Sequence, residues 1–142
     1  MGNEKRKEVK AWLAKAGNDL RGAEVDLAAD PPLVEDALFH CQQATEKALK
    51  AFLTAHDTPF RKTHDLDELA SACERFDGSL KETLNPARDL TVFAWEFRYP
   101  GSDDVPPESE AHDSLLLARS AVQAISERLR VRQPGFDDDE AV

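Results

Sequence analysis

Residues 37–53 read ALFHCQQATEKALKAFL. Within this stretch a series of mostly apolar residues recurs at alternating intervals of three and four residues. The series begins one turn earlier and runs through Val34, Leu38, Cys41, Thr45, Ala48 and Phe52. Because an α-helix turns by about 100° per residue, this spacing places the whole series on one face. We therefore expect a long amphipathic helix that reaches about Ala55 and is broken at Thr58-Pro59.

Two further segments repeat this spacing. The first runs through Val9, Leu13, Ala16, Leu20, Ala23 and Leu27, and the last through Ala111, Leu115, Ala118, Val122, Ile125 and Leu129. Between them the pattern predicts a short helix from about His64 to Phe76 and another helix from Ser79 toward Phe97, interrupted near Pro86. The sequence thus predicts an all-α fold, an up-and-down antiparallel bundle of four main helices plus a short fifth.

The chain organisation follows from length and charge. The 142 residues suit one domain with one core, and 41% apolar residues are enough to build that core. We expect a flexible N-terminus at 1–6, the helical bundle at 7–131 and a disordered acidic tail at 132–142. The net charge of −10 repels phosphate backbones, so nucleic-acid binding would require a local basic patch.

Composition also bears on the compartment. Cys41 and Cys73 both lie in apolar-periodic segments, which favours buried thiols in a reducing compartment over a disulfide between them. No apolar run reaches the roughly 18 residues of a membrane span, and the polar N-terminus lacks a signal-peptide pattern. We expect a soluble cytoplasmic protein without membrane contact.

Polar residues interrupt the apolar face of the helix around residues 37–53. Gln42 and Glu46 lie one turn apart at the margin of the apolar arc, so we expect them to be half-buried. A buried carboxylate requires a partner, and Arg98 is our candidate. We favour a structural polar network of Gln42, Glu46 and Arg98 over a functional site. The outer side of this helix is expected to carry His40, Gln43, Lys47 and Lys50.

Two loop segments are further candidates. Residues 62–66 read KTHDL where a loop enters a helix, and Lys62 and His64 would add positive charge to a helix start that attracts anions. Plain capping by Asp65 or Thr63 is the favoured interpretation. At residues 97–101 (FRYPG), an arginine beside an aromatic ring suits either phosphate or base contacts or a helix-end ion pair.

Other chemistries find little support in the sequence. The four histidines form no i, i+4 pair with one another and no HExxH motif, so no metal site is expected. There is no glycine-rich phosphate loop and no nucleophile-elbow serine, and Cys41 on an apolar face favours a core position over a nucleophile. No cofactor is expected.

Taken together, residues 37–53, 62–66 and 97–100 resemble the HEPN family, helical domains often paired with nucleotidyltransferases. The resemblance covers about residues 7–131. It implies an up-and-down helical bundle that is usually a homodimer. It also implies one of two roles: a nucleotide-binding partner of a minimal nucleotidyltransferase, in toxin–antitoxin pairs or related operons, or metal-independent RNA cleavage through an Arg-x(4–6)-His motif.

The sequence departs from that cleavage motif. Arg98 lies where the family's arginine is expected, but residues 99–107 contain no histidine and the next one is His112. An RNase without metal requires an acid/base group near the 2′-hydroxyl and the phosphate. The resemblance therefore favours a non-enzymatic module, and the acidic balance points away from RNA in the same direction.

Three functional hypotheses remain. In the first, a dimeric module binds a nucleotide or a nucleotidyltransferase: Lys47 and Arg98 hold phosphate, Tyr99 stacks and Glu46 orients Arg98, with His64 and Lys62 secondary. In the second, the chain is an RNase toxin with a degenerate motif. In the third, it is a purely structural dimerisation bundle. The candidate dimer contacts are Phe39, Phe93 and Trp95.

Overall fold

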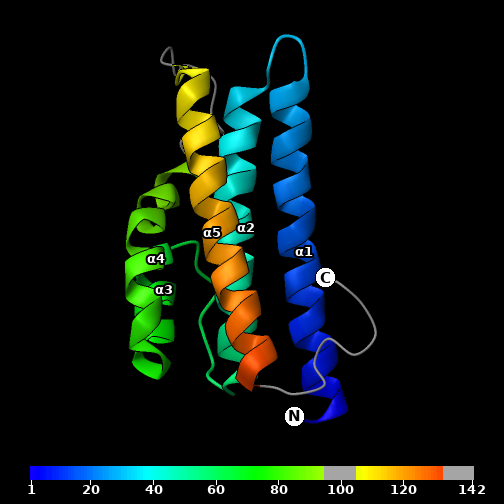
Figure 1. Ribbon diagram of the computed structural model, residues 1–142, viewed down its shortest axis with the longest axis vertical. Helices are drawn as coiled ribbons and strands as arrows, with labels where there is room; N and C mark the ends of the chain where they lie inside the picture. Colours follow the sequence, from blue (N-terminus) through cyan, green and yellow to red (C-terminus); the bar gives the residue numbers. More distant parts are fainter. Residues whose placement is uncertain (95–104, 133–142) are drawn as a thin grey trace.

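The computed structural model describes residues 1–94 and 105–132, the last two by their helical backbone alone, and this part of the chain contains helices and no strand (Figure 1). Its elements are, in order, α1 (Asn3–Ala28), α2 (Val34–Ala55), α3 (Leu66–Phe76), the 3-10 turn η1 (Gly78–Leu80), α4 (Lys81–Ala87), the 3-10 segment η2 (Arg88–Ala94) and α5 (Glu108–Arg132). The predicted all-α bundle of four main helices plus a short fifth is confirmed.

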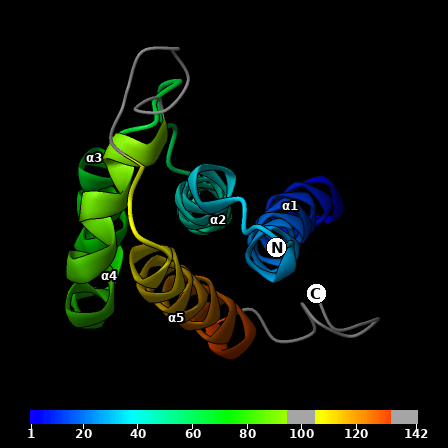
Figure 2. The ribbon, with the colours of Figure 1, turned by 90° about the horizontal axis from the view of Figure 1, so that it is seen from above.

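Helix α2 occupies the centre of the bundle. Seen from above, it lies between α1 on one side and the α3–α4 pair on the other, with α5 packed against it (Figure 2). Fourteen of the 22 residues of α2 are buried, compared with six of the 26 residues of α1. Because α2 is covered on nearly every side, polar residues along it must find partners inside the protein.

The core is built from the predicted apolar faces. Leu38, Leu49 and Phe52 of α2 are at most 1% exposed, and they pack with Leu13 of α1 and Ile125 of α5. Full burial of each such side chain contributes about 1.5–3 kcal/mol. Phe93, a candidate dimer contact from the sequence, is 8% exposed and belongs to this core, so that assignment was wrong.

The predicted fourth helix is divided in two. Its α-helical part ends at Ala87, and residues 88–94 continue as the tighter 3-10 segment η2. Pro86 lies inside α4 and has no N–H group to donate to a preceding carbonyl, which explains why the regular helix stops there. Trp95, Arg98, Tyr99 and residues 133–142 of the predicted acidic tail lie outside the described residues.

Two further findings concern the N-terminus and the possibility of a membrane span. Helix α1 begins at Asn3, inside the segment 1–6 that the sequence assigned to a flexible end. None of the described helices combines the length and the apolar character that a membrane span requires.

Both cysteines are buried and unpaired, as expected from their positions in apolar segments. Burial raises the pKa of the Cys41 thiol to about 12 and raises the pKa of the Cys73 thiol as well. The Cys73 thiol donates a long hydrogen bond to the carbonyl oxygen of Leu49, 3.6 Å away. Since only the thiolate is an effective nucleophile or metal ligand, both residues serve packing.

Candidate functional site

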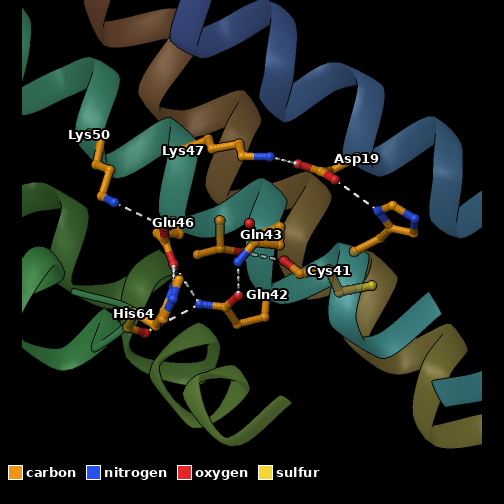
Figure 3. A network of polar contacts seen from close by, with 10 residues as sticks. Asp19, Cys41, Gln42, Gln43, Glu46, Lys47, Lys50 and His64 are labelled. Atoms are coloured by element: carbon orange, nitrogen blue, oxygen red, sulfur yellow. Dashed lines mark hydrogen bonds and ion pairs between the residues drawn. The ribbon is translucent and has the colours of Figure 1, made fainter. Parts of the chain in front are cut away.

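A closed polar network lies between α2 and the start of α3 (Figure 3). Glu46 is 4% exposed, and its Oε1 accepts a hydrogen bond from Gln42 Nε2 at 3.0 Å and lies 2.8 Å from His64 Nδ1. Its Oε2 accepts a hydrogen bond from Lys50 Nζ at 2.9 Å. We call Gln42, Glu46, Lys50 and His64 the Glu46 cluster.

Helix geometry assembles this cluster. Gln42, Glu46 and Lys50 are spaced by four residues, so they form a row on one face of α2. Gln42 Nε2 also donates to the carbonyl oxygen of His64, 3.2 Å away, which ties α2 to the loop before α3. Burial alone would raise the pKa of Glu46, but hydrogen bonds from Gln42, His64 and Lys50 outweigh it and lower that pKa below its ordinary value.

The position of Lys50 corrects the sequence-based interpretation. Lys50 was assigned to the outer side of the helix, but it is 7% exposed, and its Nζ lies 5.6 Å from the ring centroids of both Trp12 and Phe60. These rings come from α1 and from the loop after α2, and they cover a face that one helix alone would leave open. The predicted partner of Glu46, Arg98, lies outside the described residues.

The opposite side of α2 carries a second polar group, facing α1. Asp19 is 8% exposed; its Oδ2 accepts a hydrogen bond from Lys47 Nζ at 2.6 Å, and its Oδ1 lies 2.8 Å from His40 Nδ1. The Lys47 ammonium, a candidate phosphate contact from the sequence, therefore already has a carboxylate partner inside the chain. An anionic ligand at Lys47 would have to compete with Asp19.

Two more carboxylates meet the other edge of the same imidazole. His40 Nε2 lies 3.4 Å from Asp36 Oδ2 and 3.9 Å from Asp26 Oδ2. Asp26 is 7% exposed, and its Oδ2 has no hydrogen-bond partner. Burial, and then the neighbouring Asp36 carboxyl group, raise the pKa of Asp26 to about 6. We call Asp26, Asp36 and His40 the Asp26 cluster.

Sequence reasoning missed the Asp26 cluster because it searched for pairs of histidines. Part of the signal was present, since Asp36 precedes His40 by four residues and both must lie on one face of α2. The third member, Asp26, comes from α1, and its contact with α2 depends on how the two helices pair. The periodicity of one helix does not determine that register.

The start of α3 is capped from within the chain. Asp65 accepts hydrogen bonds from the backbone N–H groups of Asp67 at 2.9 Å and Glu68 at 3.3 Å, which confirms the capping interpretation. Thr63 Oγ1 accepts from the Asp65 N–H at 3.0 Å. Lys62 is exposed in the same loop. The helix start itself is therefore occupied by a carboxylate of the chain.

The five ligand candidates from the sequence do not form one described site. Lys62 and His64 share the loop before α3, and the His64 side chain is 48% exposed. Lys47 reaches toward α1 on the other side of α2, as Figure 3 shows. Arg98 and Tyr99 lie outside the described residues.

Comparison with known proteins assigns the sequence to a family. The family model for the HEPN domain matches residues 9–129, which is nearly the whole bundle. The searches of the curated proteins and of the solved structures each find no match.

Proposed function

The chain belongs to the HEPN domain family, and we propose that it is a non-enzymatic member that serves as the partner subunit of a minimal nucleotidyltransferase. The observation that carries the proposal is the internal use of the polar side chains on α2. Glu46 is bound by Gln42, Lys50 and His64, and Lys47 is bound by Asp19. Groups held in this way stabilise a scaffold and leave recognition to its surface.

Nucleotide contact, on this proposal, involves the loop before α3. Lys62 is exposed, and His64 keeps half of its ring accessible although Glu46 fixes its orientation. A phosphate approaching this loop would meet the Lys62 ammonium without displacing an internal partner of α2. Arg98 and Tyr99 remain part of the proposal as a second phosphate contact and a stacking ring.

The first test concerns the partner. Tagged full-length chain is used to retrieve proteins from its native cells, and mass spectrometry identifies what is retained. The proposal expects a nucleotidyltransferase in about equal amount to the bait. Retention of other proteins without any nucleotidyltransferase, at native expression level, would contradict it.

The second test concerns the nucleotide. Isothermal titration with ATP is expected to give heat that Lys62→Ala weakens, because the exposed Lys62 ammonium is the proposed phosphate contact. Lys81→Ala is the matched control, since Lys81 is also exposed but lies on α4. Heat that is absent, or equally reduced by both variants, counts against nucleotide binding at this loop.

One observation favours a second candidate, a metal-independent RNase. A buried carboxylate orients the His64 ring, with Nδ1 2.8 Å from Glu46 Oε1, and the ring is half-exposed. Such a carboxylate-oriented imidazole is a suitable general base. His64 would take the place of the histidine in the family's cleavage motif, which this chain lacks after Arg98.

The RNase candidate has a direct test. RNA cleavage is measured in EDTA for the unaltered protein, for His64→Ala and for the control His112→Ala, whose histidine is exposed on α5. The RNase candidate requires cleavage that His64→Ala abolishes and His112→Ala preserves. RNA left intact by the unaltered protein would end it and would leave the partner role in place.

The third hypothesis is a purely structural dimerisation bundle. It shares the homodimer with the partner role but predicts that neither a nucleotidyltransferase nor a nucleotide binds. Light scattering on the purified chain measures the oligomeric state, and Phe39→Glu tests the remaining described contact candidate. A dimer that binds neither a nucleotidyltransferase nor a nucleotide would favour this hypothesis over the first.

A further inference from the structure

The geometry points to a divalent-cation site between α1 and α2, with Asp26, Asp36 and His40 as its protein ligands. The site lies at the hairpin end of the two helices, since Asp26 is near the end of α1 and Asp36 near the start of α2. It is separate from the Glu46 cluster and from the nucleotide contact proposed above. The inference stands whichever functional proposal holds.

The ligand atoms are close to the spacing that a metal ion imposes. One oxygen of each carboxylate and Nε2 of His40 all lie within 4.8 Å of one another, and the two distances from Nε2 are 3.4 Å and 3.9 Å. A tetrahedral ion with bonds of about 2.0 Å holds its ligand atoms about 3.3 Å apart. The two distances from Nε2 exceed that spacing by about 0.6 Å or less, and the distance between the two carboxylate oxygens exceeds it by about 1.5 Å or less, which carboxylate rotation can supply.

A second observation points to a ligand independently of this clustering. Asp26 is more than nine-tenths buried, and its Oδ2, the atom nearest to His40, has no hydrogen-bond partner. Buried carboxylate oxygens are normally satisfied, because leaving one without a donor is costly. No lysine or arginine in residues 1–94 and 105–130 pairs with Asp26 or Asp36. A divalent cation would satisfy the oxygen and balance both carboxylates.

Asp19 orients the histidine as an outer ligand partner does. Its Oδ1 lies 2.8 Å from His40 Nδ1, which leaves Nε2 directed at Asp26 and Asp36. Histidines that bind metals usually donate the second ring N–H to a carboxylate in this way. Lys47 in turn binds the other oxygen of Asp19 and holds it in place.

Gly22 gives the ring its room. A Cβ atom at this position would lie 3.0 Å from His40 Nε2 and 3.1 Å from two carbon atoms of the ring. A glycine in a helix interior is less stable than an alanine, yet Gly22 allows the imidazole to approach the α1 backbone between Asp19 and Asp26.

The donor set indicates the class of ion. One imidazole nitrogen with two carboxylate oxygens suits a borderline divalent ion such as Zn²⁺, whereas Mg²⁺ and Ca²⁺ prefer oxygen ligands alone. The Asp36 side chain is 58% exposed, so the ion can enter from solvent and water can complete its coordination. Bound there, it would join the two helices beside their connecting turn.

The test uses the full-length chain stripped with EDTA and titrated with Zn²⁺ by calorimetry at pH 7.5, with thermal unfolding as a second readout. One ion per chain should bind and raise the unfolding midpoint. Asp36→Asn, an exposed position, should weaken binding at least tenfold, and Asp26→Asn should do the same. Circular dichroism confirms that each variant is folded.

The matched control is a second acid–histidine pair. Glu108 and His112 on α5 are also four residues apart, with Oε2 3.2 Å from Nε2, but both are exposed, and among the described residues no third ligand joins them. Glu108→Gln should leave the affinity unchanged. Absence of Zn²⁺ binding, binding that survives Asp26→Asn or Asp36→Asn, or equal binding of Mg²⁺ would overturn the assignment.

Discussion

Two buried carboxylates on opposite sides of α2 have opposite electrostatic surroundings. Glu46 and Asp26 are similarly buried, 4% and 7% exposed. Hydrogen bonds from Gln42, His64 and Lys50 lower the pKa of Glu46 despite burial, whereas burial and the Asp36 carboxyl raise the pKa of Asp26 to about 6. Since burial is nearly equal, the partners determine which form of the carboxyl group the fold favours.

The comparison separates a carboxylate with a full set of partners from a pair of carboxylates that must share one partner. In the Glu46 cluster one carboxylate meets a lysine, an amide and an imidazole. In the Asp26 cluster two carboxylates share one imidazole, whose other nitrogen faces Asp19. The first cluster needs nothing from outside the chain, and the second gains from an added cation. Substitutions in the two clusters should therefore change stability in opposite directions.

The largest effect is expected from Glu46→Gln. The change removes the carboxylate that pairs with the buried Lys50 ammonium and leaves that charge without this counter-ion, which is destabilising by about 3 kcal/mol. Urea unfolding measures the free energy. The control is Glu68→Gln, which breaks the exposed ion pair with Arg61 and should have no measurable effect. Equal effects of the two variants would mean that the Glu46 cluster contributes no more than a surface pair.

A smaller effect of opposite sign is expected from Asp26→Asn in EDTA. The neutral amide is isosteric, removes repulsion with Asp36 and supplies a donor, so the unfolding free energy should rise by on the order of 1 kcal/mol. Urea unfolding at neutral pH tests this. A loss of stability as large as that of Glu46→Gln would show that Asp26 has a stabilising partner and would remove the contrast.

Two glycines of α1 provide a third contrast. Nothing lies within 4 Å of a Cβ added at Gly17, so Gly17→Ala should stabilise the helix by about 0.8 kcal/mol. At Gly22 the same methyl group would meet the His40 ring at 3.0 Å, and that ring is held by Asp19. Gly22→Ala should therefore gain less or lose stability, as measured by thermal unfolding. An equal gain at both positions would show that the ring moves freely.

Sequence alone could predict the parts of this protein that depend on one helix at a time. The spacing around Leu38 and Phe52 identified the core face of α2, and Asp65 was one of the two helix caps predicted for α3. Lys50 was misplaced because its burial depends on Trp12 and Phe60, which come from elsewhere in the chain. A helical wheel for a single helix assigns it an outer side, but α2 lies at the centre of the bundle and has almost no exposed side.

The two polar clusters show the same difference between contacts within one helix and contacts between elements. The i, i+4 pairs Glu46–Lys50 and Asp36–His40 could have been read from the sequence, since they need only helical geometry, although neither was predicted. The partners from α1 and from the loop before α3 were not, because they depend on the rotation and register of packed helices. Asp26 is the clearest case. Nothing in its local sequence indicates that its Oδ2 would lie near the His40 imidazole and accept no hydrogen bond.

The smallest effect concerns acid stability and again distinguishes Glu46 from an exposed carboxylate. Its pKa in the folded protein lies below the ordinary value of 4.5, because Gln42, His64 and Lys50 stabilise the ionised form against burial. This contribution is therefore fully present above pH 4.5 and is lost as the pH falls below that value toward the lower folded pKa. Glu46→Gln should flatten the fall of the urea midpoint in that acidic window. Since the Lys50 charge and the hydrogen bonds from Gln42, His64 and Lys50 favour the ionised form of Glu46, a variant with an unchanged acid slope would contradict the assigned direction.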